Sequence, residues 1–152
     1  MNAMRVLITA ILATAMGIAF SGCATHATRT ATPEYENGTY RGAFIDEGII
    51  QVNVQIVLED GIVTAASFRH LVGAVPEYNL DTTDEPQRSV VAQYEEALQY
   101  LVGKRLADHL DDLYRPQDVI TREVDGYTQA TVRANKIVSA IRDALNRGVY
   151  EY

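Results

Sequence analysis

The clearest pattern in the chain is a strict alternation of apolar and polar side chains across residues 50–58. The apolar positions are Ile50, Val52, Val54, Ile56 and Leu58. This alternation predicts a strand with one buried face and one wet face. Residues 59–61 read Glu-Asp-Gly, a turn in which Asp-Gly favours positive φ, and residues 62–71 are expected to return as the partner strand of a hairpin.

Other segments fit around this hairpin. Residues 38–44 form a short expected strand bounded by glycines, and residues 73–86 an expected loop. Residues 88–101 carry the apolar stripe of a helix, at Val90, Val91, Tyr94, Ala97, Leu98 and Leu101. After Gly103, the positions Leu106, Leu110 and Leu113 predict a second helix that Pro116 closes. Val119 and Ile120 are expected to be extended.

A last helix is predicted from residue 130 onward. Its apolar face is formed by Ala134, Ile137, Val138, Ile141, Ala144 and Leu145. Thr128 is the expected N-cap, and Gly148 the residue that ends the helix after Arg147. Thr131 then falls in the first turn, where backbone N–H groups favour an anion. Strands followed by helices predict an α+β domain, in which an antiparallel sheet is packed by the middle helices and by the Ile137, Ile141 and Leu145 stripe.

The first 22 residues have the features of an export signal. Arg5 is followed by an apolar run, residues 6–20, that is too short for a membrane span. Residues 20–23, Phe-Ser-Gly-Cys, resemble the lipobox of bacterial lipoproteins, which implies lipidation of Cys23 and anchoring in the bilayer. The alternative is an ordinary secretory signal with a chance cysteine. The expected organisation is a signal peptide (1–22), a lipidated cysteine with a flexible tether (23–34), and one domain (35–152).

Composition narrows the classes of function. The 152 residues carry a formal charge of −7, which argues against a nucleic-acid surface because phosphate binding needs a basic face. A single cysteine excludes an intramolecular disulfide. The three histidines have no metal-ligand spacing, and there is no nucleophile elbow and no phosphate-binding loop. We therefore predict no metal site and no catalytic side chain.

Two segments carry a family resemblance. Asp125-Gly126-Tyr127-Thr128-Gln129-Ala130-Thr131 resembles the attachment motif of the FMN-binding domain family, usually Asp-x-x-Ser/Thr-Gly-Ala-Thr. Asp125, Thr128, Ala130 and Thr131 match, and Gln129 stands where the family has Gly. Residues 38–42, Gly-Thr-Tyr-Arg-Gly, with the hairpin that follows, resemble the N-terminal half of that domain. The family includes flavoprotein subunits of sodium-pumping quinone reductases and related lipoproteins.

The resemblance implies covalent FMN, joined through a phosphoester to Thr131 by a separate flavin transferase that uses FAD and a divalent metal. Residues 125–130 would form the attachment segment, in which Asp125 either caps the turn or, as the family implies, is recognised by the transferase and its metal. Arg133 is expected in the first helical turn, where its guanidinium can hydrogen-bond the same phosphate. Tyr127, Tyr40 and Tyr78 are candidate stacking partners for the flavin ring.

The implied function is that of an exported, lipid-anchored electron carrier rather than a stand-alone enzyme. It would pass electrons between a membrane reductase and another redox partner protein outside the cytoplasm. Ala24 follows the lipidated cysteine and favours the outer membrane where the cell has two membranes. Two alternatives stay open. One is a flavin-free binding or structural lipoprotein of the same fold, with Gln129 marking a degenerate motif, and the other is a small reductase with noncovalent FMN.

Overall fold

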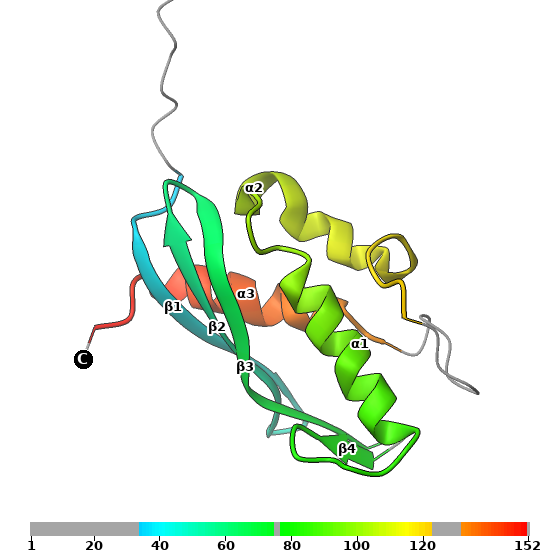
Figure 1. Cartoon of the computed structure of the whole chain (residues 1–152). Helices are drawn as coiled ribbons and strands as arrows, with labels where there is room; N and C mark the ends of the chain where they lie inside the picture. Colours follow the sequence, from blue (N-terminus) through cyan, green and yellow to red (C-terminus); the bar gives the residue numbers. More distant parts are fainter. Residues whose placement is uncertain (1–33, 75–76, 123–131, 152) are drawn as a thin grey trace, which may run out of the picture. The chain divides into compact units, whose positions relative to one another are not determined.

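The computed structural model describes residues 34–74, 77–122 and 132–151, all within the compact unit Thr32–Tyr152 (Figure 1). Four strands come first and are followed by three α-helices and two short 3₁₀ helices, which confirms the α+β class with an antiparallel sheet. The elements are β1 (Gly38–Asp46), β2 (Ile49–Glu59), β3 (Ile62–Ala74), β4 (Glu77–Asn79), α1 (Gln87–Gln99), α2 (Leu106–His109), η1 (Leu110–Tyr114), η2 (Pro116–Asp118) and α3 (Asn135–Arg147).

The sheet has the order β1-β2-β3-β4, and every neighbouring pair is antiparallel. The predicted alternation in β2 is confirmed from residue 52 onward, since the core-facing side chains Val52, Val54, Ile56 and Leu58 are fully buried. The turn between β2 and β3 has positive φ at Asp60 and Gly61, 51° and 77°, as Asp-Gly favours. The hairpin at the centre of the sheet is therefore the one that the sequence predicts.

The expectation for Ile50 is wrong, because its side chain is 42% exposed. The register of β1 and β2 shifts between Phe44 and Ile45, so that Phe44 pairs with Val52 while Ile45 pairs with Ile50. This bulge leaves Gln51 as the extra residue and turns Ile50 away from the core, as ordinary alternation after Phe44 does for Ile45. An exposed apolar tip results, with Ile45 at 55% and Ile49 at 60% exposure.

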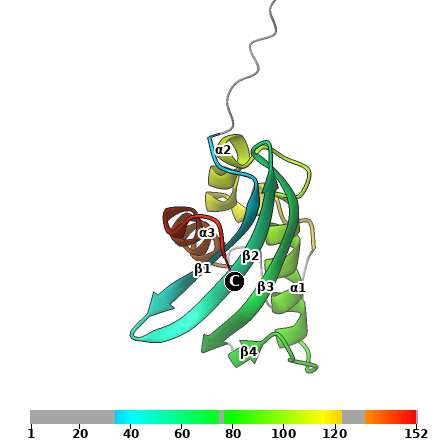
Figure 2. The same cartoon turned by 90° about the vertical axis from the view of Figure 1, so that its left-hand side faces the viewer.

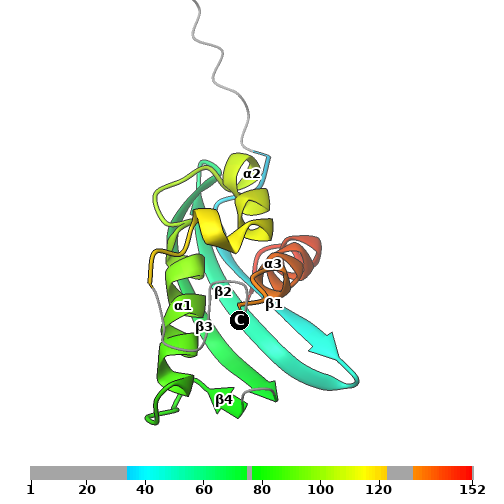
Figure 3. The same ribbon diagram turned by 90° about the vertical axis from the view of Figure 1, so that its right-hand side faces the viewer.

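Helices α1 and α3 lie on one face of the sheet, α1 against β3 and β4 and α3 against β1 and β2 (Figures 2 and 3). The predicted stripe of α1 is buried throughout, as are Ile137 and Ile141 of α3, with Leu145 partly buried. Gly42 of β1 lets α3 approach closely, since a Cβ there would lie 2.7 Å from Cα of Ala144. Gly148 ends α3 with φ of 83°, as predicted. The other face of the sheet carries no helix among the described residues.

Three other predictions need correction. The expected loop 73–86 contains strand β4, which pairs with the end of β3. The expected helix through Leu106, Leu110 and Leu113 is split into α2 and the 3₁₀ helix η1, although all three leucines are buried as expected. Val119 and Ile120 are buried but belong to no strand. None of the helices in the described ranges has the length and apolar character needed to cross a bilayer.

Candidate functional site

The predicted attachment segment lies outside the described residues, as does Cys23. This holds for Asp125, Gly126, Tyr127, Thr128, Gln129, Ala130 and Thr131. The residues on either side of the segment are described, and both flanks are hydrogen-bonded to helix α1.

The N-terminal flank is held by the carboxylate of Glu96. One oxygen accepts hydrogen bonds from Thr121 N at 2.8 Å and Thr121 Oγ1 at 2.6 Å, and the other accepts from Arg122 N at 3.2 Å. Gln93 Nε2 also donates to the Arg122 carbonyl at 2.8 Å. Burial alone would raise the pKa of Glu96, but the hydrogen bonds from Thr121 and Arg122 outweigh it and lower the pKa. The carboxylate is therefore ionised at neutral pH and fixes this flank.

The C-terminal flank returns to the same helix. Val132 is 2% exposed and belongs to the core. The Arg133 backbone N–H donates to the Tyr94 hydroxyl at 3.1 Å, while the Arg133 side chain stays exposed. Since Gln93, Tyr94 and Glu96 lie within one turn of α1, one short stretch of helix anchors both ends of residues 123–131.

The expected start of the last helix is wrong. Val132 and Arg133 are not helical, and α3 begins at Asn135 with Ala134 as its N-cap. Arg133 therefore precedes the helix rather than lying in its first turn. The cause is long-range: Val132 is drawn into the core, and the Arg133 N–H is already bound to Tyr94. No side chain among the described residues caps α3, and its first turn contains no acidic residue.

Two cationic side chains, Arg133 and Lys136, belong to the residues at the start of α3. Lys136 lies in the first turn, and its pKa is lowered by burial and by repulsion from Arg133, against the attraction of Asp46. Its Nζ donates to Gln51 Oε1 and lies 5.7 Å from the centre of the Phe44 ring. An uncapped helix N-terminus beside two cations favours an anion, because the dipole and both charges have the same sign.

Both described candidates for a stacking partner, Tyr78 and Tyr40, are buried. Tyr78 packs against Tyr94 with ring centroids 5.7 Å apart. The pKa of Tyr78 is raised far above its ordinary range by burial, by the neighbouring Tyr94 hydroxyl and by the hydrogen bond between the two side chains. The Arg133 charge acts in the opposite direction. Tyr40 is 3% exposed and donates to the Glu36 carbonyl at 2.8 Å.

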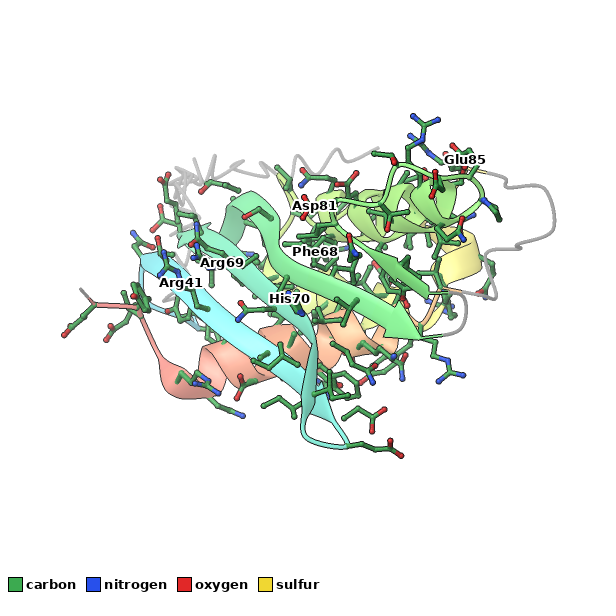
Figure 4. The ribbon with its side chains drawn as sticks, turned by 90° about the horizontal axis from the view of Figure 1, so that it is seen from below. Arg41, Phe68, Arg69, His70, Asp81 and Glu85 are labelled. Carbon is green, nitrogen blue, oxygen red and sulfur yellow. The ribbon has the colours of Figure 1, made fainter. Side chains whose placement is uncertain are left out.

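A hollow of about 510 Å³ lies beside Tyr78, between β4 and the start of α1. Asp81, labelled in Figure 4, and Asp84 both line it. Two carboxylates in a polar hollow disfavour a phosphate, so the anion-favouring position is the start of α3 and not this hollow.

Sequence reasoning missed the side chains that hold the flanks. Gln93 is fully buried, and its Oε1 has no hydrogen-bond partner among the described residues. It occupies a position on the apolar stripe of α1, between Val90 and Ala97. A polar residue at that position was the signal that could have predicted a buried hydrogen-bonding role for Gln93. Glu96 and Lys136 gave no such signal, because solvated helix faces contain the same residue types.

His109 takes part in a polar contact elsewhere in the domain. His109 Nδ1 lies 2.9 Å from Asp112, which also accepts a hydrogen bond from Tyr100 at 2.7 Å. His70 lies within β3, and it is exposed. Comparison of the chain with known protein families, with curated proteins and with solved structures finds no match in any of the three.

Proposed function

We propose that this chain is an electron-transfer flavoprotein that carries one FMN, joined through its phosphate to the hydroxyl of Thr131. The observation that carries the proposal is the pair of cations, Arg133 and Lys136, at the uncapped start of α3, close after Thr131 in the chain. A phosphodiester keeps one negative charge at neutral pH, and this charge would relieve the repulsion between the two cations.

The described residues fit such a group. Arg133 and Lys136 would hold the phosphate by charge-assisted hydrogen bonds, and the first backbone N–H groups of α3 would add the helix dipole, about 0.3–1 kcal/mol at an exposed site. Tyr78, which is 7% exposed and packs against Tyr94, is the described candidate for the aromatic partner of the flavin ring. The bound flavin would supply the electron transfer, and the chain would supply binding and orientation.

The anchored flanks of residues 123–131 support recognition by a flavin transferase. An enzyme that modifies Thr131 must bind the residues around it, and flanks that are already fixed need less ordering on binding. Glu96 and Gln93 fix one end, and Tyr94 fixes the other. In this proposal Asp125 is recognised by the transferase and its metal rather than by the phosphate, since like charges repel.

In this proposal the N-terminal residues determine where the protein is located in the cell. Lipidation of Cys23 would anchor the domain to a bacterial membrane, facing the periplasm or the cell exterior. The tether, residues 24–33, would give it a reach of roughly 15–20 Å. Covalent attachment suits this location, because a dissociated FMN outside the cytoplasm is lost. The electron partners would be a membrane reductase and a second redox protein.

Coexpression with a flavin transferase tests the proposal. After denaturing electrophoresis we expect flavin fluorescence that stays with the protein band in the wild type and in Thr131→Ser, and none in Thr131→Ala. Thr64→Ala removes an exposed hydroxyl on β3 and is the control that keeps the signal. Fluorescence released by denaturation indicates noncovalent FMN. Its complete absence supports the flavin-free lipoprotein, which the substitution of Gln129 for the family's Gly favours.

A further inference from the structure

The backbone groups at the two sides of the sheet are used differently. On the β1 side, the Thr39 carbonyl accepts a hydrogen bond from Tyr150 N at 2.7 Å. Further along the same strand, Ala43 N donates to Asp143 Oδ2 of α3 at 2.8 Å. On the other side, β3 pairs with β4 only at residues 72–74, so most of β3 is also an edge of the sheet. Uncovered strand edges are templates for pairing with another chain, and proteins ordinarily cover them.

The direction of the β3 backbone groups follows from one contact and the register. The Ala66 carbonyl accepts a hydrogen bond from Gln99 Nε2 of α1 at 2.7 Å, so the backbone groups of Ala66 point away from β2. Residues 65–68 pair with residues 54–57 of β2 without a shift. Since backbone groups alternate in direction along an antiparallel strand, the Phe68 N–H and carbonyl point the same way as those of Ala66.

Most of these outward-facing groups lack a partner. Before this stretch, both backbone groups of Val63 are hydrogen-bonded to the loop that follows α1, at 3.0 and 2.8 Å. After it, pairing with β4 begins at Val72. Between these two positions, the contact from Gln99 is the only hydrogen bond that a described residue outside β2 and β3 makes to the β3 backbone. The Ala66 N–H and both outward groups of Phe68 are therefore open to a new strand.

A hollow of about 450 Å³ lies beside this open edge, between β3 and α1. Phe68, labelled in Figure 4, and Leu80 are partly buried against the core, and Leu98 is 1% exposed, so the hollow has an apolar floor. The full lining is Ala66, Ser67, Phe68, Leu80, Glu95, Leu98 and Gln99. An apolar side chain from a segment paired with β3 can enter this hollow, because side chains of directly paired residues lie on the same face.

Glu95 adds a preference for positive charge. It is exposed on the wall of the hollow, and it forms no hydrogen bond or ion pair with any described residue. Gln99 contacts Ala66 and α1 begins beside β4, so Glu95, one helical turn before Gln99, lies further along β3, toward Phe68. Residues two apart in an extended segment share a face, so a basic residue can meet Glu95 while an apolar one occupies the hollow.

We propose that the open edge of β3 binds an extended segment of a partner protein by strand addition, antiparallel to β3. The segment exchanges backbone hydrogen bonds with Ala66 and Phe68 and replaces Gln99 at the Ala66 carbonyl. It carries an apolar residue for the hollow and, two positions earlier, a Lys or Arg for Glu95. The antiparallel direction is that of every neighbouring pair in this sheet. The binding is independent of the flavin, because none of the residues assigned to FMN contributes to this edge.

An NMR titration of the ¹⁵N-labelled full chain in a neutral detergent tests this, with the peptide acetyl-Thr-Lys-Thr-Leu-Thr-amide as the probe. We expect saturable shifts of the Ala66 and Phe68 amide signals at one site per chain. In the proposed register the leucine N–H points to β3, and the N–H of the central threonine points away. N-methylation of the leucine should therefore weaken binding by about tenfold, and N-methylation of the central threonine should have little effect.

Three variants of the chain test the same contacts. Ala66→Pro removes an outward N–H at a strand edge, where proline is tolerated, and should abolish binding. Glu95→Gln should weaken the peptide by about threefold, as expected for an exposed ion pair. Glu47→Gln makes the same charge change in the exposed turn between β1 and β2 and should have no effect. The N-methylated peptides repeat the backbone test on the wild-type chain, so the test does not depend on the folding of Ala66→Pro.

Three results would overturn the proposal. The first is the absence of saturable shifts at Ala66 and Phe68. The second is equal affinity of the two N-methylated peptides, or a loss with the threonine derivative alone, since either contradicts antiparallel backbone pairing in this register. The third is a change of the Ala66 and Phe68 signals on dilution of the free chain, which would assign the edge to a second copy of the chain.

Discussion

Replacing Tyr94 by Phe should loosen the segment that precedes α3 without changing the packing of the core. The Tyr94 ring is 2% exposed, and Phe preserves its volume. Only the hydroxyl is lost, and with it the acceptor for the Arg133 N–H at 3.1 Å and the partner of Tyr78. The change therefore isolates the contact that fixes the end of the attachment segment.

The expected loss of stability follows from the two groups that lose a hydrogen-bond partner, the Arg133 N–H and the Tyr78 hydroxyl. A buried donor or acceptor left without a partner costs about 1–3 kcal/mol. Arg133 is exposed, so water can replace part of its lost hydrogen bond, whereas Tyr78 is only 7% exposed. We expect a loss of roughly 2 kcal/mol in the free energy of unfolding, with faster hydrogen exchange at the Arg133 amide. In a domain of this size each kcal/mol lowers Tm by roughly 3–6 °C.

Urea unfolding followed by circular dichroism measures the loss, and an unchanged m value would show that compactness is preserved. Tyr114→Phe is the matched control, because Tyr114 is 49% exposed and should change stability by less than about 0.5 kcal/mol. If Tyr94→Phe is as stable as this control and the Arg133 amide exchanges at its wild-type rate, the hydroxyl does not anchor the segment and the reasoning fails.

Three further substitutions test the packing and the electrostatics. Gly42→Ala should destabilise by about 2–3 kcal/mol, because the added Cβ would press on the α3 backbone at Ala144 and Ala140; a wild-type urea midpoint would show that α3 can move. Glu96→Gln should cost about 1 kcal/mol at neutral pH. Hydrogen bonding lowers the folded pKa of Glu96 below the ordinary 4.5. The difference in unfolding free energy between the wild type and Glu96→Gln should therefore be complete above pH 4.5 and vanish as the pH falls below it. Urea titrations at several pH values that show a constant difference would contradict the assignment. Leu113→Ala should cost about 2–5 kcal/mol, since Leu113 is fully buried, and calorimetry showing a smaller loss would mean that the site collapses around the cavity.

The elements that the sequence predicted well are those fixed by local pattern. The β2–β3 hairpin follows from alternation and an Asp-Gly turn, and the burial of Val52 to Leu58 depends only on that period. The stripe of α1 and the end of α3 at Gly148 are likewise local, because apolar spacing and a glycine with positive φ determine them. In each case residues close together in the sequence determine the local structure.

The features that the sequence did not predict depend on distant residues. Strand β4 is three residues long and exists through its pairing with the end of β3. The start of α3 is set by Tyr94, 39 residues before Arg133, and by the burial of Val132. The exposure of Ile50 follows from a bulge that neither strand reveals alone. The role of Lys136 at α3 was unavailable to sequence reasoning for the same cause, since its side chain is oriented by Gln51 of β2.

Peptide mapping tests the central proposal most directly. Trypsin should cut after Arg122 and Arg133 and release residues 123–133, which contain Thr128 and Thr131 as the only threonines. After coexpression with a flavin transferase, we expect this peptide to gain the mass of one FMN less one water, with fragment ions that place the addition on Thr131. An unmodified peptide from a chain exposed to active transferase, or a flavin located on Thr128, would contradict attachment at the start of α3.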